Sequence, residues 1–230
     1  MQSNVKLVTF DVYMALVDIQ GGLTETVAAA LSLPADTAGS FVTEWRAAQM
    51  LRAASSNSLA RGHTRFRDCT RMALRSVAGR RGIDLSETDA ENLVRAWDRL
   101  PPWPEADAAL AEVKALGVGI GILSNGDPDM LAAIAAQFET PFDHILSAAT
   151  AGQYKPHPAV YALPETILGL DRNATVHVAG SANDVLGARA YGMPCIWSNR
   201  RHDAPLDVDF AATTEVASLT GVADALAALT

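Results

Sequence analysis

The chain has 230 residues, of which 49% are hydrophobic and 19% charged, a composition typical of a globular protein and not of a disordered one. Its formal net charge of −8 disfavours binding to nucleic acid or to an anionic membrane, because both need clustered lysine and arginine. Two cysteines outside any metal-binding pattern, and no apolar run of the roughly 18 residues that a membrane span needs, predict a cytoplasmic protein whose cysteines serve packing.

The first predicted element is a short buried strand at residues 5–10, which ends directly before Asp11. Residues 24–100 contain no convincing strand and show helical patterns at 24–31, 37–55, 64–81 and 86–99. A helical block between the first and the second strand is an insertion. The consecutive prolines Pro101 and Pro102 mark the return from this insertion to the core, because proline cannot continue a helix.

The second half of the chain alternates between predicted strands and helices. Strands are predicted at 118–123, near residue 145, at 174–179 and at 194–197, and helices at 105–116, 128–138, 159–168 and 184–191. Such alternation predicts an α/β fold with a parallel sheet and right-handed crossovers. We expect one domain at residues 1–17 and 101–230 and a helical insertion at residues 18–100.

Polar and reactive side chains follow the predicted strands where each strand ends. Alone, a strand-end Asp or Ser is commonly only a helix N-cap. Because parallel strands end at one edge of the sheet, where ligands bind in such folds, we expect these side chains to converge. They are Asp11, Ser124, Asn125, Lys155 and Asp184.

This group of residues suits a hydrolase that uses a carboxylate nucleophile. Asp11 is a competent nucleophile if it is held ionised and oriented. The opposite charge of Lys155 would keep it ionised, and Asp184 could hold or deprotonate water in a later step. Ser124 and Asn125 offer donors for an anionic group of the substrate.

Four motifs in this order resemble the haloacid dehalogenase superfamily: FDVYMAL around Asp11, LSNG, YKPHPAVY and VAGSANDVLGARAYG. The 2-haloacid dehalogenase branch is the most similar, and EWRAAQ in the insertion resembles the cap helix of that branch with its arginine. The resemblance implies a Rossmann-like core with a helical cap, a homodimer, and an ester on Asp11 that water then hydrolyses. It implies no metal or other cofactor.

The resemblance also implies roles for single residues. Asp11, Lys155 and Asp184 match the family's nucleophile, lysine and water-handling aspartate. Arg46 matches the arginine that meets the leaving group or the substrate carboxylate. The residues expected to bind the small carboxylate substrate are Tyr13, Arg46, Ser124, Asn125, Tyr161, Ser181 and Asn183.

Several expected pocket residues are replaced in this chain. Met14 stands in place of a glycine, Ala15 of a threonine, Ser181 of an asparagine and Asn183 of a tryptophan, and Ala47 is also changed. The pattern predicts that displacement chemistry is retained on an altered substrate. A short 2-haloalkanoate is the default. The alternative is the opening of a strained cyclic amino acid, azetidine-2-carboxylate, a reaction that occurs in the same branch.

The sequence leaves two other classes of function open, a phosphatase and a non-catalytic binding protein. A phosphatase of this superfamily would have a second aspartate at Tyr13 and an acidic Mg²⁺ ligand at Gly180, so the chain is poor in the oxygen ligands that Mg²⁺ requires. None of the five histidines is assigned to a metal, because none has metal-binding spacing. A non-catalytic binding protein stays possible because a fold does not fix a function.

Overall fold

The computed structural model describes residues 5–59 and 62–229. The chain folds into two compact units. The first combines the residues before Asp18 with those after Pro101, and the second is Asp18–Pro101. The two connecting segments run side by side: Val17 forms an isolated β-bridge with Pro102, and the Asp18 amide donates to the Pro101 carbonyl. No helix in the described part of the chain is both long and apolar enough to cross a membrane.

The first unit is built on a six-stranded parallel sheet in the order β3-β2-β1-β4-β5-β6. This arrangement confirms the predicted α/β fold. The short edge strand β6, which is only half-buried, carries no apolar run and was absent from the prediction. The strands are β1 (Leu7–Phe10), β2 (Gly119–Ser124), β3 (His144–Ser147), β4 (Thr175–Ala179), β5 (Cys195–Ser198) and β6 (Thr214–Val216).

Strands β1 and β4 lie side by side at the centre of the sheet, and every residue of both is buried. Central parallel strands are covered on both faces, so they are normally apolar throughout. Three polar residues break this pattern, Thr9 in β1 and Thr175 and His177 in β4, and the register places Thr9 opposite His177. Buried polar groups are costly unless they are hydrogen-bonded, so this pair needs partners inside the core.

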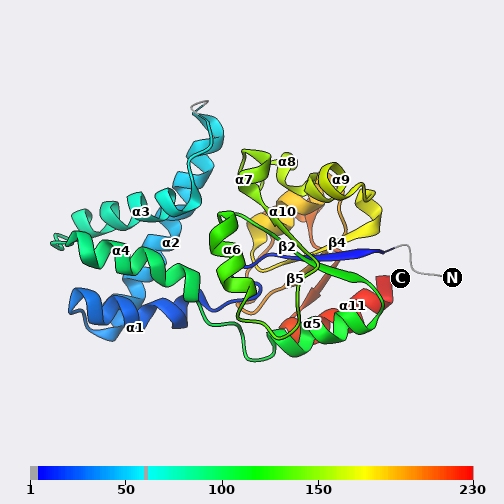
Figure 1. Ribbon diagram of the computed structural model, residues 1–230, viewed down its shortest axis with the longest axis horizontal. Helices are drawn as coiled ribbons and strands as arrows, with labels where there is room; N and C mark the ends of the chain where they lie inside the picture. The colour runs from blue at the N-terminus through cyan, green and yellow to red at the C-terminus, as the bar shows by residue number, and fades with distance from the viewer. Residues whose placement is uncertain (1–4, 60–61, 230) are drawn as a thin grey trace. The chain divides into compact units, whose positions relative to one another are not determined.

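Helices cover both faces of the sheet. Helices α5 and α11 pack against each other on one face, and α8 and α10 pack together on the other (Figure 1). The single helix predicted at 159–168 is in fact two, α8 and α9, with Pro164 in the first turn of α9. The helices are α5 (Ala106–Ala115), α6 (Pro128–Ala135), α7 (Ala148–Ala151), α8 (Pro158–Tyr161), α9 (Leu163–Leu168), α10 (Ala182–Tyr191) and α11 (Val222–Leu229), with 3₁₀ turns at Arg172–Ala174, Val208–Phe210 and Leu219–Gly221.

The second unit is entirely helical in its described residues. Helix α2 packs against α1 and α3, and α4 packs against the same two helices. Trp45 and Trp97 form the centre, edge to face with their rings 5.4 Å apart. Asp18 and Ser86 cap the N-termini of α1 and α4 with their side-chain oxygens. The helices are α1 (Ile19–Leu31), α2 (Ala35–Ser58), α3 (Phe66–Arg80) and α4 (Glu87–Ala96), followed by the 3₁₀ turn Trp97–Arg99.

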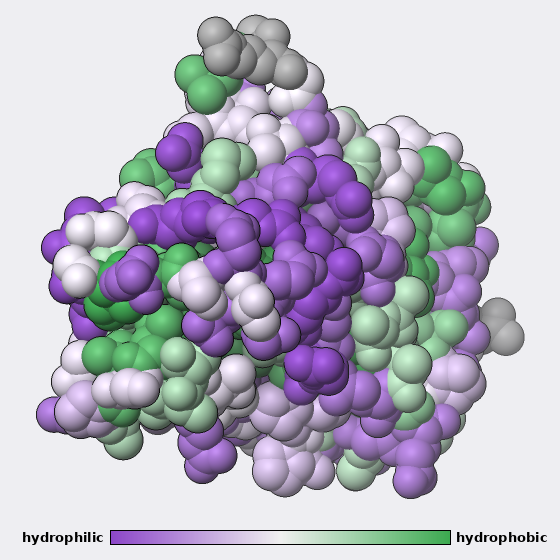
Figure 2. Space-filling model, turned by 60° about the vertical axis from the view of Figure 1, so that its left-hand side comes forward, coloured by the Kyte–Doolittle hydropathy of each residue, from purple (hydrophilic) through white to green (hydrophobic). Residues whose placement is uncertain are grey.

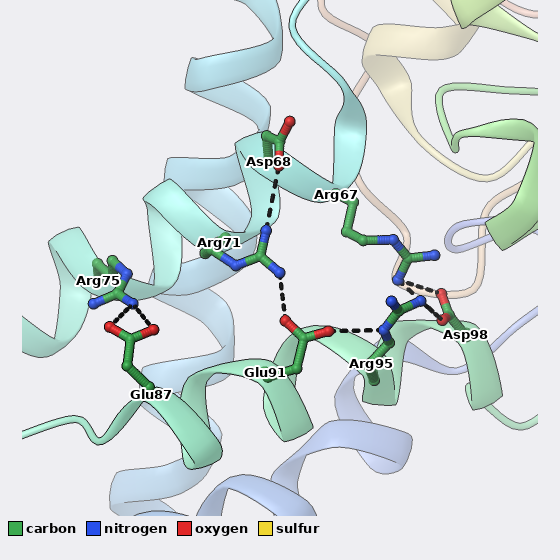
Figure 3. Close-up of polar contacts among 8 residues, drawn as sticks. All are labelled: Arg67, Asp68, Arg71, Arg75, Glu87, Glu91, Arg95 and Asp98. Atoms are coloured by element: carbon green, nitrogen blue, oxygen red, sulfur yellow. Dashed lines mark hydrogen bonds and ion pairs between the residues drawn. The ribbon is translucent and has the colours of Figure 1, made fainter.

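A chain of ion pairs joins α3 to α4 and the turn after it (Figure 3). At its buried end, Arg67 Nη1 lies 2.9 Å from Asp98 Oδ2, with only 7% and 16% of the two side chains exposed. From Asp98 the chain continues through Arg95 and Glu91 to Arg71, which also pairs with Asp68. A separate, exposed pair joins Arg75 to Glu87. Hydrophilic side chains gather over the middle of the face shown in Figure 2, beside a smaller hydrophobic area.

Candidate active site

Asp11 lies at the carboxyl end of β1, where its amide still donates to the Val178 carbonyl of β4. Its side chain is buried, and its Oδ1 accepts a hydrogen bond from Ser124 Oγ at 2.9 Å. The Lys155 ammonium lies 3.4 Å from the same oxygen. A single carboxylate oxygen is therefore oriented by a hydroxyl at the end of β2 and by a cation from the loop between α7 and α8.

Lys155 links the two carboxylates of the site. Its Nζ lies 2.8 Å from Asp184 Oδ2 as well as 3.4 Å from Asp11 Oδ1, and the side chain is 4% exposed. The loop that carries Lys155 is held in place by Asn125, whose Oδ1 accepts the Lys155 backbone N–H at 2.9 Å. In this structure Asn125 thus supports the lysine loop, a contact that its predicted role in substrate binding did not include.

Asp184 sits in the first turn of α10, and both of its carboxylate oxygens are engaged. Oδ1 accepts from the Tyr161 hydroxyl at 2.8 Å. Oδ2 lies 2.8 Å from Lys155 Nζ and 2.9 Å from His177 Nε2. Tyr161 has room to reach Asp184 because residue 187 is glycine: a Cβ there would overlap the Tyr161 ring and hydroxyl.

The two carboxylates have opposite pKa shifts. Burial raises the pKa of Asp11 above its ordinary value, and the charge of Lys155 offsets only part of that rise. Burial would also raise the pKa of Asp184, but the charge of Lys155 and the hydrogen bonds with His177 and Lys155 outweigh it and hold that pKa well below the usual range. For Lys155, burial is outweighed by the attraction of both carboxylates, which raises its pKa and keeps it an ammonium.

His177 is the site residue that the sequence did not reveal. It is completely buried in β4, with Nδ1 2.9 Å from Thr9 Oγ1 and Nε2 close to both Asp184 and Lys155. The sequence did hold a signal: a histidine inside an apolar strand needs buried hydrogen-bonding partners. The sequence could not identify the hydrogen-bond partner of His177, because Thr9 lies 168 positions away along the chain.

Three more of the predicted pocket residues, Ser181, Asn183 and Tyr13, belong to the same unit as this cluster. Ser181 and Asn183 are half-buried at the start of α10, and their side chains make no hydrogen bond with other residues in the described ranges. The ring of Tyr13 is buried and crosses to the loop after β2, where its hydroxyl would lie 3.0 Å from a Cβ placed on Gly126. Tyr13 therefore packs over the loop that holds Ser124 and Asn125.

Arg46 belongs to the helical unit, so the contacts described for it are those of that unit. Its Nη1 donates to Gln49 Oε1 at 2.5 Å, and its guanidinium lies 5.8 Å from the centre of the Trp97 ring. Gln49 is fully buried and donates in turn to Thr70 Oγ1 at 2.5 Å. This chain of contacts fixes the orientation of the Arg46 head group.

Gly180 lies where the loop after Asp11 comes closest to β4. A Cβ on Gly180 would overlap the backbone of Met14 and Ala15, so no side chain fits at this position. Met14 itself has φ of 84°, a conformation that favours glycine. Position 180 therefore cannot carry a carboxylate unless the loop moves.

The two cysteines have the packing environment that the sequence predicts. Both are buried, and neither forms a disulfide bond within the described residues. Burial raises the pKa of the Cys195 thiol far above its ordinary value, so this sulfur is held as the weakly nucleophilic thiol.

Comparison with known proteins agrees with the geometry. A family model described as haloacid dehalogenase-like hydrolase matches residues 5–192. An (S)-2-haloacid dehalogenase of Pseudomonas sp. strain YL is 37% identical over 169 residues, which cover 73% of each chain. The solved L-2-haloacid dehalogenase from Xanthobacter autotrophicus superposes with a TM-score of 0.88 at 27% identity, covering 98% of this chain and 100% of the other. The same enzyme with chloropropionic acid covalently bound gives 0.85 at 26% identity, with coverage of 98% and 100%.

Proposed function

Since this chain belongs to the haloacid dehalogenase-like hydrolase family, we propose that it displaces a leaving group from C2 of a small carboxylic acid through an ester on Asp11. The observation that carries the proposal is the placement of Asp11 Oδ1. Ser124 Oγ and Lys155 Nζ hold this buried oxygen from two sides. Such restraint is what a carboxylate needs in order to act as an oriented nucleophile.

In the first step, one oxygen of Asp11 attacks C2 from the side opposite the leaving group, so that the carbon is inverted. The new C–O bond forms as the bond to the leaving group breaks, and the leaving group departs with the electron pair. Asp11 loses its negative charge in this step. Lys155 then faces one ionised carboxylate, that of Asp184, in place of two.

In the second step, water attacks the carbonyl carbon of the Asp11 ester. Asp184 is suited to orient this water, because its pKa is held well below the usual range and the group stays ionised and accepts hydrogen bonds. Cleavage at the carbonyl carbon returns the Asp11 carboxylate and releases a 2-hydroxy acid. The oxygen of the water ends up on Asp11, and an oxygen of Asp11 leaves with the product.

For the substrate we propose a short 2-haloalkanoate, the class named for the relatives of this chain. Arg46 would bind the carboxylate or the halide, in keeping with its fixed guanidinium. No metal takes part in these steps, and the ammonium of Lys155 supplies the positive charge between the two carboxylates.

One observation favours a second substrate. Asn183 and Ser181 are half-buried polar side chains at the start of α10, and within the described residues neither is used in a hydrogen bond. They suit a leaving group that stays tethered and needs hydrogen bonds, as the ring amine of azetidine-2-carboxylate does. Attack by Asp11 would open the ring, and water would release 4-amino-2-hydroxybutanoate.

The ester is tested by a single turnover in ¹⁸O-labelled water with enzyme in excess over 2-chloropropionate. Label in the Asp11 peptide supports the ester route, and label in the product alone rules it out. Asp11→Asn, which keeps the size of the side chain, should fold normally and release no chloride.

The leaving group is tested with two substrates in parallel. Chloride release from 2-chloropropionate without primary amine from azetidine-2-carboxylate supports the haloacid. The reverse result assigns the ring-opening reaction, and inorganic phosphate release from phosphate esters alone would contradict both.

A further inference from the structure

Arg46 is held by a buried amide one turn further along α2. Gln49 Oε1 accepts from Arg46 Nη1, and Gln49 Nε2 donates to Thr70 Oγ1 of α3, each at 2.5 Å. Gln49 and Thr70 are completely buried. We propose that Gln49 and Thr70 are positioning residues for turnover, which hold the Arg46 guanidinium in the orientation that binds the anionic group of the substrate. This inference rests on the role of Arg46 proposed above.

The hydrogen bonds run in one direction, from Arg46 to the backbone of α3. A guanidinium has donors only, so the atom of Gln49 that faces it must be the amide oxygen. The amide nitrogen then faces Thr70, whose hydroxyl accepts from it and gives its own single proton to the Phe66 carbonyl at 2.8 Å. The amide of Gln49 therefore cannot turn over without placing its nitrogen against the donor of Arg46.

The burial of Gln49 has a cost that packing alone does not explain. A buried amide is costly unless it is hydrogen-bonded, whereas an apolar side chain of similar size would fill the same space without that cost. Both polar atoms of Gln49 are engaged, one by Arg46 and one by Thr70. The presence of an amide at this buried position is therefore better explained by its effect on Arg46.

A neutral acceptor suits an arginine that has to bind an anion. A carboxylate at position 49 would pair with the guanidinium and offset its charge, whereas an amide orients the group and leaves the charge in place. Orientation matters because the N–H groups of a guanidinium point in fixed directions within one plane. Only a correctly turned guanidinium can direct them at the anion.

Two tryptophans complete the support. The guanidinium carbon of Arg46 lies 5.8 Å from the centre of the Trp97 ring, close enough for a cation–π contact. Trp45 packs edge to face on Trp97, and its Nε1 donates to the Thr70 carbonyl at 2.8 Å. The ring beneath the guanidinium and the threonine that fixes the amide are thus tied to each other.

The test compares kcat/KM for 2-chloropropionate in variants of the two positioning residues. Gln49→Met is similar in size but has no acceptor, and it should lower kcat/KM by about tenfold, the scale of one hydrogen bond to a charged group. Thr70→Val removes the hydroxyl that fixes the amide and should lower kcat/KM by at least about threefold. Thr70→Ser keeps that hydroxyl and should stay within about twofold of the wild type.

Two matched controls come from the same helical unit. The side chains of Gln20 and Thr43 also make hydrogen bonds there, both to the Gly39 carbonyl. Neither is linked to Arg46 by these bonds, so Gln20→Met and Thr43→Val should leave kcat/KM unchanged. Urea unfolding of all variants shows which of them fold.

Two measurements separate orientation of Arg46 from a general effect on structure. Lysine keeps the charge but has no planar fork to orient, so in an Arg46→Lys background Gln49→Met should lower kcat/KM by less than about twofold further. In ¹⁵N NMR spectra, Nη1 and Nη2 of Arg46, assigned by their loss in Arg46→Lys, should give separate signals in the wild type. In Gln49→Met these signals should merge as the guanidinium rotates.

The outcomes are distinct. A folded Gln49→Met with kcat/KM within about twofold of the wild type, or an equal loss in the Arg46→Lys background, overturns the positioning role. If Gln49→Met does not fold, equal kcat/KM values for Thr70→Val and Thr70→Ser overturn it. A wild type that releases no chloride and never labels Asp11 overturns the proposed function instead, whatever the NMR signals of Arg46 show.

Discussion

Ser124 Oγ donates a hydrogen bond of 2.9 Å to Asp11 Oδ1, although the two residues lie 113 positions apart. They meet because β1 and β2 are parallel neighbours, with Phe10 at the end of β1 opposite Ile122 of β2. The hydroxyl stabilises the ionised form of Asp11 and so opposes the effect of burial on its pKa.

Replacing Ser124 by alanine should therefore raise the pKa of Asp11 further. The nucleophile is the carboxylate, so kcat/KM falls as the pH falls through that pKa. Burial places this acid limb above the ordinary value of 3.8, and in Ser124→Ala it should move to still higher pH. On the plateau we expect a loss of about tenfold, the scale of one hydrogen bond to a charged group. Ser198→Ala, a buried serine at the end of β5, is the control whose pH profile should match the wild type.

Removal of the Lys155 ammonium should affect the nucleophile more strongly. In Lys155→Met, burial and the charge of Asp184 both raise the pKa of Asp11, and the largest effect that opposes them is gone. Ester formation in a single turnover should slow by at least about tenfold, the equivalent of one pKa unit of interaction. Lys114→Met, which breaks an ion pair with Asp143 outside the site, should change the rate little. A rate for Lys155→Met within a few-fold of the wild type would remove Lys155 from the mechanism.

The ion pairs of the helical unit should differ in their contribution to stability. Arg67→Met removes the nearer of the two arginines beside the largely buried Asp98 and leaves the longer contact with Arg95, and we expect the free energy of unfolding to fall by about 2–4 kcal/mol. Arg75→Met breaks a pair in which 42% and 84% of the side chains are exposed, and solvent screening should limit the loss to about 1 kcal/mol or less. Urea unfolding of both variants gives the comparison, and equal losses would contradict it.

The conformation of Met14 allows a direct measurement of backbone strain. Glycine adopts φ of 84° freely, whereas alanine shares the strain of methionine and lacks its side chain. Met14→Gly should therefore be more stable than Met14→Ala by about 1 kcal/mol in thermal or urea unfolding. If alanine is the more stable of the two, the loop is not strained at this residue.

Metal removal tests the phosphatase alternative. Turnover should survive extensive dialysis against EDTA, because the ammonium of Lys155 bridges the two carboxylates and position 180 has no room for a third. Chloride release before and after dialysis, with and without added Mg²⁺, is the measurement. Activity that returned only with Mg²⁺ would revive the alternative.

The sequence predicted the fold class because its strands and helices alternate clearly. It also pointed to Asp11, Lys155 and Asp184, because residues that follow parallel strands must lie at one edge of the sheet. The structure places the Lys155 ammonium within ion-pair distance of both Asp11 and Asp184.

Other features of the site could not be predicted, because they depend on contacts between residues that lie far apart in the sequence. The partnership of Thr9 and His177 arises from the register of two strands far apart in the chain. The use of Asn125 to hold the Lys155 loop likewise requires the path of that loop in space. The fit of Gly180 against the loop after Asp11 is a third case, since its cause is a close approach of two backbones.

The central position of β1 also has a consequence for the order of folding. Leu7 pairs with Gly119 on one side and with Thr175 on the other, so the nucleophile's strand finds neighbours only after long stretches of chain have been made. The helices of Asp18–Pro101 contact one another at shorter separations and need no such delay. Because local contacts form faster than distant ones, the helical unit should become protected from hydrogen exchange before the sheet does during refolding. The strand that precedes Asp11 is then synthesised before both of the strands that pair with it and is among the last parts of the chain to become protected.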